Sequence, residues 1–109
     1  MEAGLRPMQI FVYILRCADG SYYVGTARGD LDHRIAEHET GALGGYTSSR
    51  RPVELVWHQE FEDPFEAVSA ERQIKGWSRK KKEALIAGDY ERLSWLAKRP
   101  SARGKTGGG

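Results

Sequence analysis

The stretch Gln-Ile-Phe-Val-Tyr-Ile-Leu-Arg-Cys-Ala-Asp-Gly-Ser-Tyr-Tyr-Val-Gly-Thr-Ala, residues 9–27, decides the fold. Residues 9–16 are rich in β-branched and aromatic side chains, a composition that favours a strand. The dipeptide Asp19-Gly20 follows, which is typical of a hairpin turn, and residues 22–27 supply a partner strand. The sequence therefore predicts a β-hairpin near the N-terminus.

The register of this hairpin decides whether its tyrosines can form one site. A two-residue loop would put Tyr13 and Tyr23 on opposite faces, because a one-residue change in pairing turns every side chain over. A three-residue loop at 18–20 pairs Cys17 with Ser21 and puts both tyrosines on one face. A shared site requires the second register. The ordinary alternative is that both are strand aromatics without a special role.

The rest of the chain predicts one more strand and four helices. The strand is expected at 53–61 and the helices at 31–39, 64–75 and 79–87, with a short last helix at 90–96. Asp30, Asp63, Ser78 and Asp89 stand where N-caps are expected. The order ββαβαα(α) predicts an α+β fold, in which a small three-stranded antiparallel sheet is flanked by helices.

Composition fits one small domain. The chain has 109 residues and a formal net charge of +2, and Cys17 is its single cysteine, which excludes an internal disulfide and a multi-cysteine zinc site. No stretch has the length and apolarity of a membrane span or a secretory signal, so we expect a cytoplasmic protein. We expect an N-terminal extension at 1–7, the domain at 8–99 and a disordered tail at 100–109.

Two polar residues lie on the inward stripe of the first predicted helix. Leu31, Arg34, Ile35 and His38 follow helical spacing and share one face. A charge on a face that packs inward needs a partner or a ligand. The alternative is that Arg34 extends past the apolar residues to solvent and that His38 is hydrogen-bonded at the helix end.

One carboxylate lies among apolar residues on the second predicted helix. Glu71 stands three positions after Val68 and three before Ile74, and we expect an apolar surface around it that consists of Phe65, Val68, Ala70, Ile74 and Trp77, with Trp77 in the core. A carboxylate there could bind a hard cation such as Mg²⁺. The alternative is an ion pair with Lys75 at i+4.

Taken together, these features resemble the GIY-YIG nuclease family, in its small stand-alone form. Phe11-Val12-Tyr13 corresponds to Gly-Ile-Tyr and Tyr23-Val24-Gly25 to Tyr-Ile-Gly, while Arg-Ile-Ala-Glu-His at 34–38 and Glu71 follow in the family's order. The loop at 46–52 is also similar, and the match covers residues 8–86. The departures are Phe11 in place of glycine and Gly29, which lengthens the segment before the helix.

The resemblance implies a metal-dependent endonuclease that cuts phosphodiester bonds of DNA. It implies that Glu71 holds one Mg²⁺ or Mn²⁺, that Arg34 binds phosphoryl oxygens, and that Tyr13 or Tyr23 acts as general base. His38 would orient that tyrosine or carry its proton. These five residues, Tyr13, Tyr23, Arg34, His38 and Glu71, are the predicted catalytic set.

Basic residues outside this set are expected to grip the nucleic-acid backbone without reading sequence. The predicted nucleic-acid-binding residues are Thr26, Arg50, Arg51, Lys75, Arg79, Lys80, Lys81 and Lys82, and Tyr46 is a candidate for stacking on an unpaired base. Single-stranded or branched DNA is therefore favoured, RNA stays open, and we expect a monomer or weak dimer. The alternatives are a nucleic-acid-binding module with little catalysis or, less favoured, a protein-binding domain.

Overall fold

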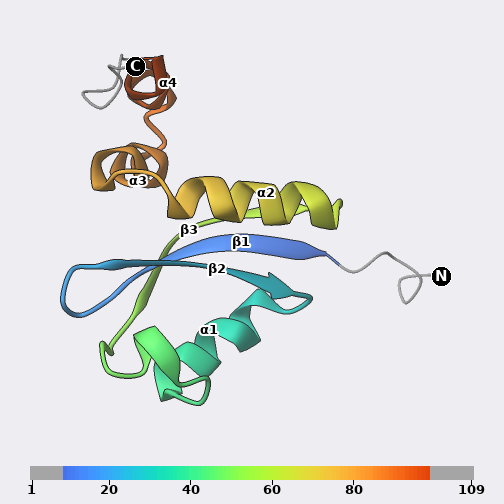
Figure 1. The fold of residues 1–109 in the computed structure, drawn as a ribbon. Coiled ribbons are helices and arrows are strands. Elements are labelled where there is room, and N and C mark those ends of the chain that lie inside the picture. Colours follow the sequence, from blue (N-terminus) through green and yellow to red (C-terminus); the bar gives the residue numbers. More distant parts are fainter. Residues whose placement is uncertain (1–8, 99–109) are drawn as a thin grey trace. The chain divides into compact units, whose positions relative to one another are not determined.

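The computed structural model describes residues 9–98 and has the α+β architecture expected from the sequence. Strands β1 (Ile10–Arg16), β2 (Tyr22–Arg28) and β3 (Glu54–Phe61) form one antiparallel sheet in the order β2-β1-β3 (Figure 1). The helices are α1 (Leu31–Thr40), α2 (Pro64–Lys75), α3 (Arg79–Ala87) and α4 (Tyr90–Lys98), with a 3-10 turn at Gly45–Thr47. The expected extension at 1–7 and tail at 100–109 lie outside the described residues.

The hairpin has the register that brings the two tyrosines to one face. Arg16 pairs with Tyr22 in the ladder, and the amide of Cys17 donates to the Ser21 carbonyl at 2.8 Å. The loop at 18–20 therefore has three residues. Gly20 has φ +85°, the left-handed conformation that a glycine adopts without strain. The prediction of a three-residue loop is confirmed.

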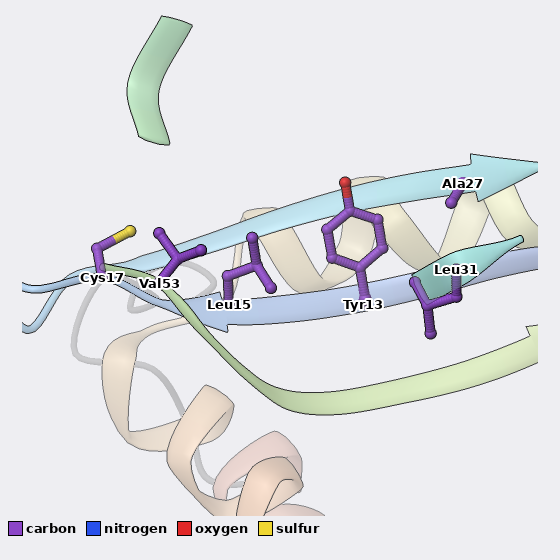
Figure 2. Close-up of a cluster of buried hydrophobic side chains, with 6 residues drawn as sticks. All are labelled: Tyr13, Leu15, Cys17, Ala27, Leu31 and Val53. Carbon is purple, nitrogen blue, oxygen red and sulfur yellow. The ribbon is translucent and has the colours of Figure 1, made fainter. Parts of the chain in front are cut away.

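The sheet is covered by α1 on one face and by α2 on the other (Figure 1). The face toward α1 carries a buried cluster, and Figure 2 shows Tyr13 and Leu15 projecting together from β1 within it. The cluster consists of Tyr13, Leu15, Cys17, Ala27, Leu31 and Val53. Tyr23 and Ile35 pack against it while partly exposed. A tyrosine thus stands at the centre of an otherwise apolar core.

Helix α1 begins and ends where its capping residues predict. The carboxylate of Asp30 accepts from the amide of His33, and Gly41 ends the helix in the left-handed conformation. Leu31 and His38 are its buried residues, while Arg34 and Ile35 are half-buried. The inward stripe predicted from the spacing is therefore confirmed, polar members included.

The expected apolar surface around Glu71 is partly wrong. The buried residues of α2 are Ala67 and Ile74, whereas Phe65 is 84% exposed and Val68 is 46% exposed. The helix faces the sheet along positions 67, 71 and 74, which places Phe65 on the opposite side. Glu71 nevertheless lies on the inward stripe, as predicted, because the stripe passes through Ala67 instead of Val68.

The chain forms two compact units, one ending at Gly76 and the other beginning at Trp77. In the second unit Ser78 and Asp89 cap α3 and α4 by accepting from the amides of Lys81 and Arg92. Trp77 was expected in the core but is partly exposed, and the ammonium of Lys81 lies 5.5 Å from its ring centre. Within residues 9–98, no helix is long and apolar enough to cross a membrane.

Candidate active site

The two tyrosines meet over a glycine of the hairpin. Tyr13 lies opposite Gly25 in the β1–β2 ladder, and the ring centres of Tyr13 and Tyr23 are 6.3 Å apart. A Cβ at Gly25 would come 2.7 Å from the Tyr13 hydroxyl and 2.8 Å from Cε2 of Tyr23. Real Cβ atoms essentially never approach so closely. The glycine of the Tyr-Val-Gly motif is therefore required by the space that both rings occupy.

His38 connects Tyr13 to the loop after α1. Its Nε2 lies 2.8 Å from the Tyr13 hydroxyl, and its Nδ1 lies 2.7 Å from Oγ1 of Thr47. The His38 ring also packs against Tyr23, with ring centres 5.1 Å apart. All three members of the Tyr13–His38–Thr47 chain are buried. His38 is therefore a hydrogen-bonded histidine near the helix end, as the alternative interpretation expected. One of its two partners is Tyr13 of the predicted site.

Burial shifts the protonation of both members of the Tyr13–His38 pair. The pKa of Tyr13 is raised to about 12, mainly by burial and to a smaller extent by Tyr23, while the Arg34 guanidinium acts in the opposite direction. Burial also lowers the pKa of His38, with Arg34 adding to the effect and Glu37 opposing it. At neutral pH Tyr13 therefore keeps its proton and His38 is neutral.

Arg34 lies beside the tyrosines and is fixed from two sides. Its Nη1 donates to the Thr26 carbonyl at 3.3 Å, and its Nε lies 3.3 Å from Oε1 of Glu37. The side chain remains 38% exposed. Thr26 thus contributes its backbone to the site. The guanidinium is held in place with donors still accessible from solvent, which suits recognition of an anion.

Glu71 lies on α2, which packs against the face of the sheet opposite to α1. Its carboxylate lies 2.8 Å from the ammonium of Lys75, and the Glu71 side chain is only 19% exposed. Glu71 raises the pKa of Lys75, and Tyr23 adds a smaller contribution in the same direction, so Lys75 lies within electrostatic range of Tyr23. The ion pair weighed from the sequence is present.

A single carboxylate such as Glu71 suits a magnesium-like ion better than a zinc-like one. Across the described residues no three His, Cys, Asp or Glu side chains gather in a group that could hold a metal. Mg²⁺ is commonly bound through one or two carboxylates, while waters and substrate phosphates supply the other oxygens. The Glu71 carboxylate already has a positively charged group beside it, because the Lys75 ammonium lies 2.8 Å away. Its position is therefore suited to a cation.

The arginines of the loop before β3 are engaged within the protein. Arg50 donates to Asp19 at 3.0 Å and to the Tyr46 carbonyl at 2.9 Å, and its guanidinium carbon lies 3.8 Å from the centre of the Tyr46 ring. Arg51 donates to the carbonyls of Ser48 and Glu39, near the end of α1. These bonds fix the loop that carries Thr47.

The remaining basic residues of the predicted nucleic-acid surface lie on α3, in the second unit. They are Arg79, Lys80, Lys81 and Lys82. Arg79 is engaged in an ion pair with Glu83 at 3.0 Å. The predicted catalytic residues Tyr13, Tyr23, Arg34, His38 and Glu71 all lie in the first unit.

Two polar residues that the sequence did not single out complete the surroundings of the site. Thr47 bonds His38, and Glu37 bonds Arg34. The sequence gives a weak indication of the Glu37 contact, because Glu37 lies three positions after Arg34 on the same helix, where an ion pair can form. It gives none of the Thr47 contact, since only the folded loop returns Thr47 to the buried end of α1.

Comparison with known proteins agrees with this arrangement. The model of the GIY-YIG catalytic domain matches residues 9–84. A UPF0213 protein of Bacillus pumilus is 45% identical over 76 residues, which cover 70% of this chain and 76% of that protein. A UPF0213 protein of Staphylococcus saprophyticus is 44% identical over 77 residues, covering 71% and 93%.

Two solution structures are also similar. The UPF0213 protein of Bacillus halodurans is 41% identical, with a TM-score of 0.50, and the match covers 82% of this chain and 97% of that one. A protein of E. faecalis is 34% identical, with a TM-score of 0.54, covering 75% and 86%. The chain therefore belongs to the GIY-YIG catalytic domain family, within its small UPF0213 group. Membership implies a nucleic-acid substrate, and GIY-YIG nucleases generally use a divalent metal ion.

Proposed function

We propose that this protein is a metal-dependent endonuclease that hydrolyses phosphodiester bonds of DNA. The observation that supports the proposal is that two tyrosines, a fixed arginine and a half-buried carboxylate belong to one compact unit, with Arg34 beside the tyrosines and Glu71 on the helix that packs against the same sheet. An ordinary binding surface has no need of a buried Tyr–His chain beside an accessible guanidinium. Phosphodiester hydrolysis does need such groups, because water must be activated and the charge on the phosphoryl oxygens must be neutralised.

Arg34 is proposed to bind the phosphoryl oxygens. Glu37 and the Thr26 carbonyl hold the guanidinium, and 38% of the side chain stays accessible for a ligand. A planar guanidinium matches two phosphoryl oxygens at once. Positive charge held before the reaction stabilises the charge that develops as water attacks phosphorus.

Tyr23 is proposed as the group that takes the proton from the attacking water. Tyr13 is fully buried, and its pKa of about 12 opposes ionisation, whereas Tyr23 is partly exposed. Lys75 lies within electrostatic range of Tyr23. Of the two alternatives left open by the sequence, the geometry therefore favours Tyr23.

Glu71 is proposed to hold one Mg²⁺ or Mn²⁺ in place of the Lys75 ammonium. The carboxylate would be the single protein ligand, with waters and phosphate oxygens completing the shell. The bound ion would polarise the phosphoryl group and stabilise the leaving oxygen. Lys75, released from Glu71, would stay close to Tyr23 and supply positive charge there.

Single-stranded or branched DNA is proposed as the substrate, over a specific duplex sequence. We expect contacts only with the nucleic-acid backbone, which carries no sequence information. These contacts would come from Arg50, Arg51, Lys75 and the basic residues of α3. The test is cleavage of labelled single-stranded, duplex and branched DNA, and of the matching RNA strand, with Mg²⁺, Mn²⁺ or a chelator. Metal-dependent cutting of single strands or branches supports the proposal. Equal cutting with chelator contradicts metal dependence, and cutting of RNA alone reassigns the substrate.

A further inference from the structure

The ring of Tyr23, the proposed general base, stacks with the ring of Tyr46. The ring centres are 6.2 Å apart, and the planes of the two rings differ by 25°. Tyr23 lies on β2, at an edge of the sheet, and is partly exposed. The rings of Tyr13 and His38 pack against it from β1 and α1, with centres 6.3 Å and 5.1 Å away. Tyr46 adds a further ring, which comes from the turn at Gly45–Thr47.

Arg50 holds Tyr46 through both its backbone and its ring. Nη1 of Arg50 donates to the Tyr46 carbonyl at 2.9 Å. The guanidinium carbon of Arg50 lies 3.8 Å from the centre of the Tyr46 ring, within the range of a cation–π contact. An exposed side chain on a loop ordinarily changes its rotamer within nanoseconds, and Tyr46 is 42% exposed. The two contacts with Arg50 oppose such motion.

Arg50 also joins this loop to the hairpin that carries Tyr23. Its Nε donates to the Asp19 carboxylate at 3.0 Å, and its carbonyl accepts from the amide of Ala18 at 2.9 Å. Ala18 and Asp19 belong to the three-residue turn between β1 and β2. The loop therefore contacts the hairpin at its turn and again at the stacked rings. Since Arg50 makes the first contact and supports the second, it fixes Tyr46 relative to Tyr23.

Base stacking, the role expected for Tyr46 from the sequence, fits this arrangement poorly. A nucleic-acid base stacks on an open aromatic face. The Arg50 guanidinium already covers one face of the Tyr46 ring, and the ring is stacked with Tyr23 as well. The contacts of Tyr46 therefore indicate a role toward Tyr23.

We propose that Tyr46, supported by Arg50, is a positioning residue that confines the ring of Tyr23 to the orientation in which it meets the attacking water. A tyrosine side chain has two rotatable bonds, and Tyr23 is packed on only part of its surface. Orientations that point the phenol away from the phosphate are unproductive, so confinement raises the fraction of complexes that react. The role in the reaction rests on the proposed function, whereas the confinement of the ring does not.

The confinement is tested by NMR relaxation of the tyrosine rings, without any substrate. We expect a lower order parameter for the Tyr23 ring in Tyr46→Leu and in Arg50→Lys, which keeps the charge but loses the planar guanidinium. Tyr46→Phe keeps the stacked ring and should keep the wild-type value. The buried ring of Tyr13 is the internal control. An unchanged Tyr23 ring in folded Tyr46→Leu, or an equal fall at Tyr13, would overturn the proposal. Arg50→Lys decides it by the same criteria if Tyr46→Leu fails to fold.

Cleavage assays separate positioning from base stacking. Tyr46→Leu should lower kcat about tenfold and leave KM within about twofold, because the chemical step is impaired and substrate binding is not. In a Tyr23→Phe background the same change should alter kcat by less than about twofold, since the residue on which Tyr46 acts is already gone. A raised KM with unchanged kcat would overturn the proposal in favour of base stacking. If the wild type cuts no nucleic acid, the proposed function fails, while the NMR result still decides whether Tyr46 confines Tyr23.

Discussion

The hydroxyl of Tyr13 lies 2.8 Å from Nε2 of His38, and both side chains are buried in the core of the sheet and α1. Tyr13 is therefore hydrogen-bonded to His38, buried away from solvent and held in its protonated form. Tyr23, on the neighbouring strand, is partly exposed and lies near Lys75. The two tyrosines of the motif thus occupy different environments, and different environments predict different roles.

Replacing each tyrosine with a fluorinated tyrosine should separate these roles. Fluorination lowers the pKa of a phenol while nearly keeping its shape. At position 23 it should move the acid side of the pH–rate profile to lower pH, because Tyr23 is the base in the proposed reaction. At position 13 it should leave that side unmoved. The measurement is single-turnover cleavage across pH, and a shift confined to position 13 would reverse the assignment.

Gly25→Ala should disturb the tyrosine pair directly. The added Cβ would lie 2.7 Å from the Tyr13 hydroxyl and 2.8 Å from Tyr23, so at least one ring must move. We expect a loss of about 1–3 kcal/mol in the free energy of unfolding, as for other overpacked cores, together with a large loss of cleavage.

Gly29→Ala is the matched control for this change. Gly29 has φ +77° and open space around its Cβ position, so alanine there strains the backbone without touching the tyrosines. It should destabilise the protein to a similar degree and retain cleavage at temperatures where the protein is folded. Equal loss of cleavage in both variants would show that stability, and not the tyrosine geometry, explains the Gly25 result.

The buried His38 should make stability depend on pH in the acid range. Its pKa is lowered from the ordinary 6.5 in the folded protein, so the unfolded chain binds a proton more readily. The stabilisation is fully present above pH 6.5 and is lost as the pH falls from 6.5 through the folded-state value. Urea unfolding at several pH values should show this slope, and His38→Gln should remove that part of it. An unchanged slope in His38→Gln would place the effect on another group.

The Glu71–Lys75 pair predicts how the protein binds a metal ion before substrate arrives. Glu71→Gln should abolish binding of Mn²⁺, measured by electron paramagnetic resonance without nucleic acid. Lys75→Met should tighten binding modestly, about twofold, because an i,i+4 ion pair at a partly exposed site is worth only ~0.3–0.5 kcal/mol. Weaker Mn²⁺ binding in Lys75→Met would mean that the lysine orients the carboxylate instead of competing for it.

Much of this site could be predicted from the sequence because its signals are local. Asp19-Gly20 and the strand composition determine the hairpin, and the hairpin register determines that Tyr13 and Tyr23 share a face. The spacing of Arg34 and His38 on α1 likewise determines that both face inward. Periodicity of 2 in strands and 3.6 in helices is sufficient for such predictions.

The parts that could not be predicted depend on packing between distant segments. The spacing of Phe65 and Val68 in the sequence predicted an apolar stripe on α2. In the structure α2 packs against the sheet through Ala67 and Ile74, which leaves Phe65 and Val68 exposed. Thr47 joins His38 only because the loop folds back on α1. The bonds of Arg50 to Asp19 and Tyr46 depend on that same loop. Such contacts are set by the fold and leave no periodic trace in the sequence.

The most direct test of the central claim is metal-dependent cleavage of labelled single-stranded DNA by the wild type, by Glu71→Gln and by Glu66→Gln. Both changes remove one carboxylate charge from α2, but Glu66 is exposed in the first turn, whereas Glu71 lies on the inward stripe. We predict Mn²⁺-dependent cutting by the wild type and by Glu66→Gln, and its loss in Glu71→Gln with DNA binding retained. Absence of cutting by folded wild type on every substrate, or equal cutting by Glu71→Gln, would contradict it.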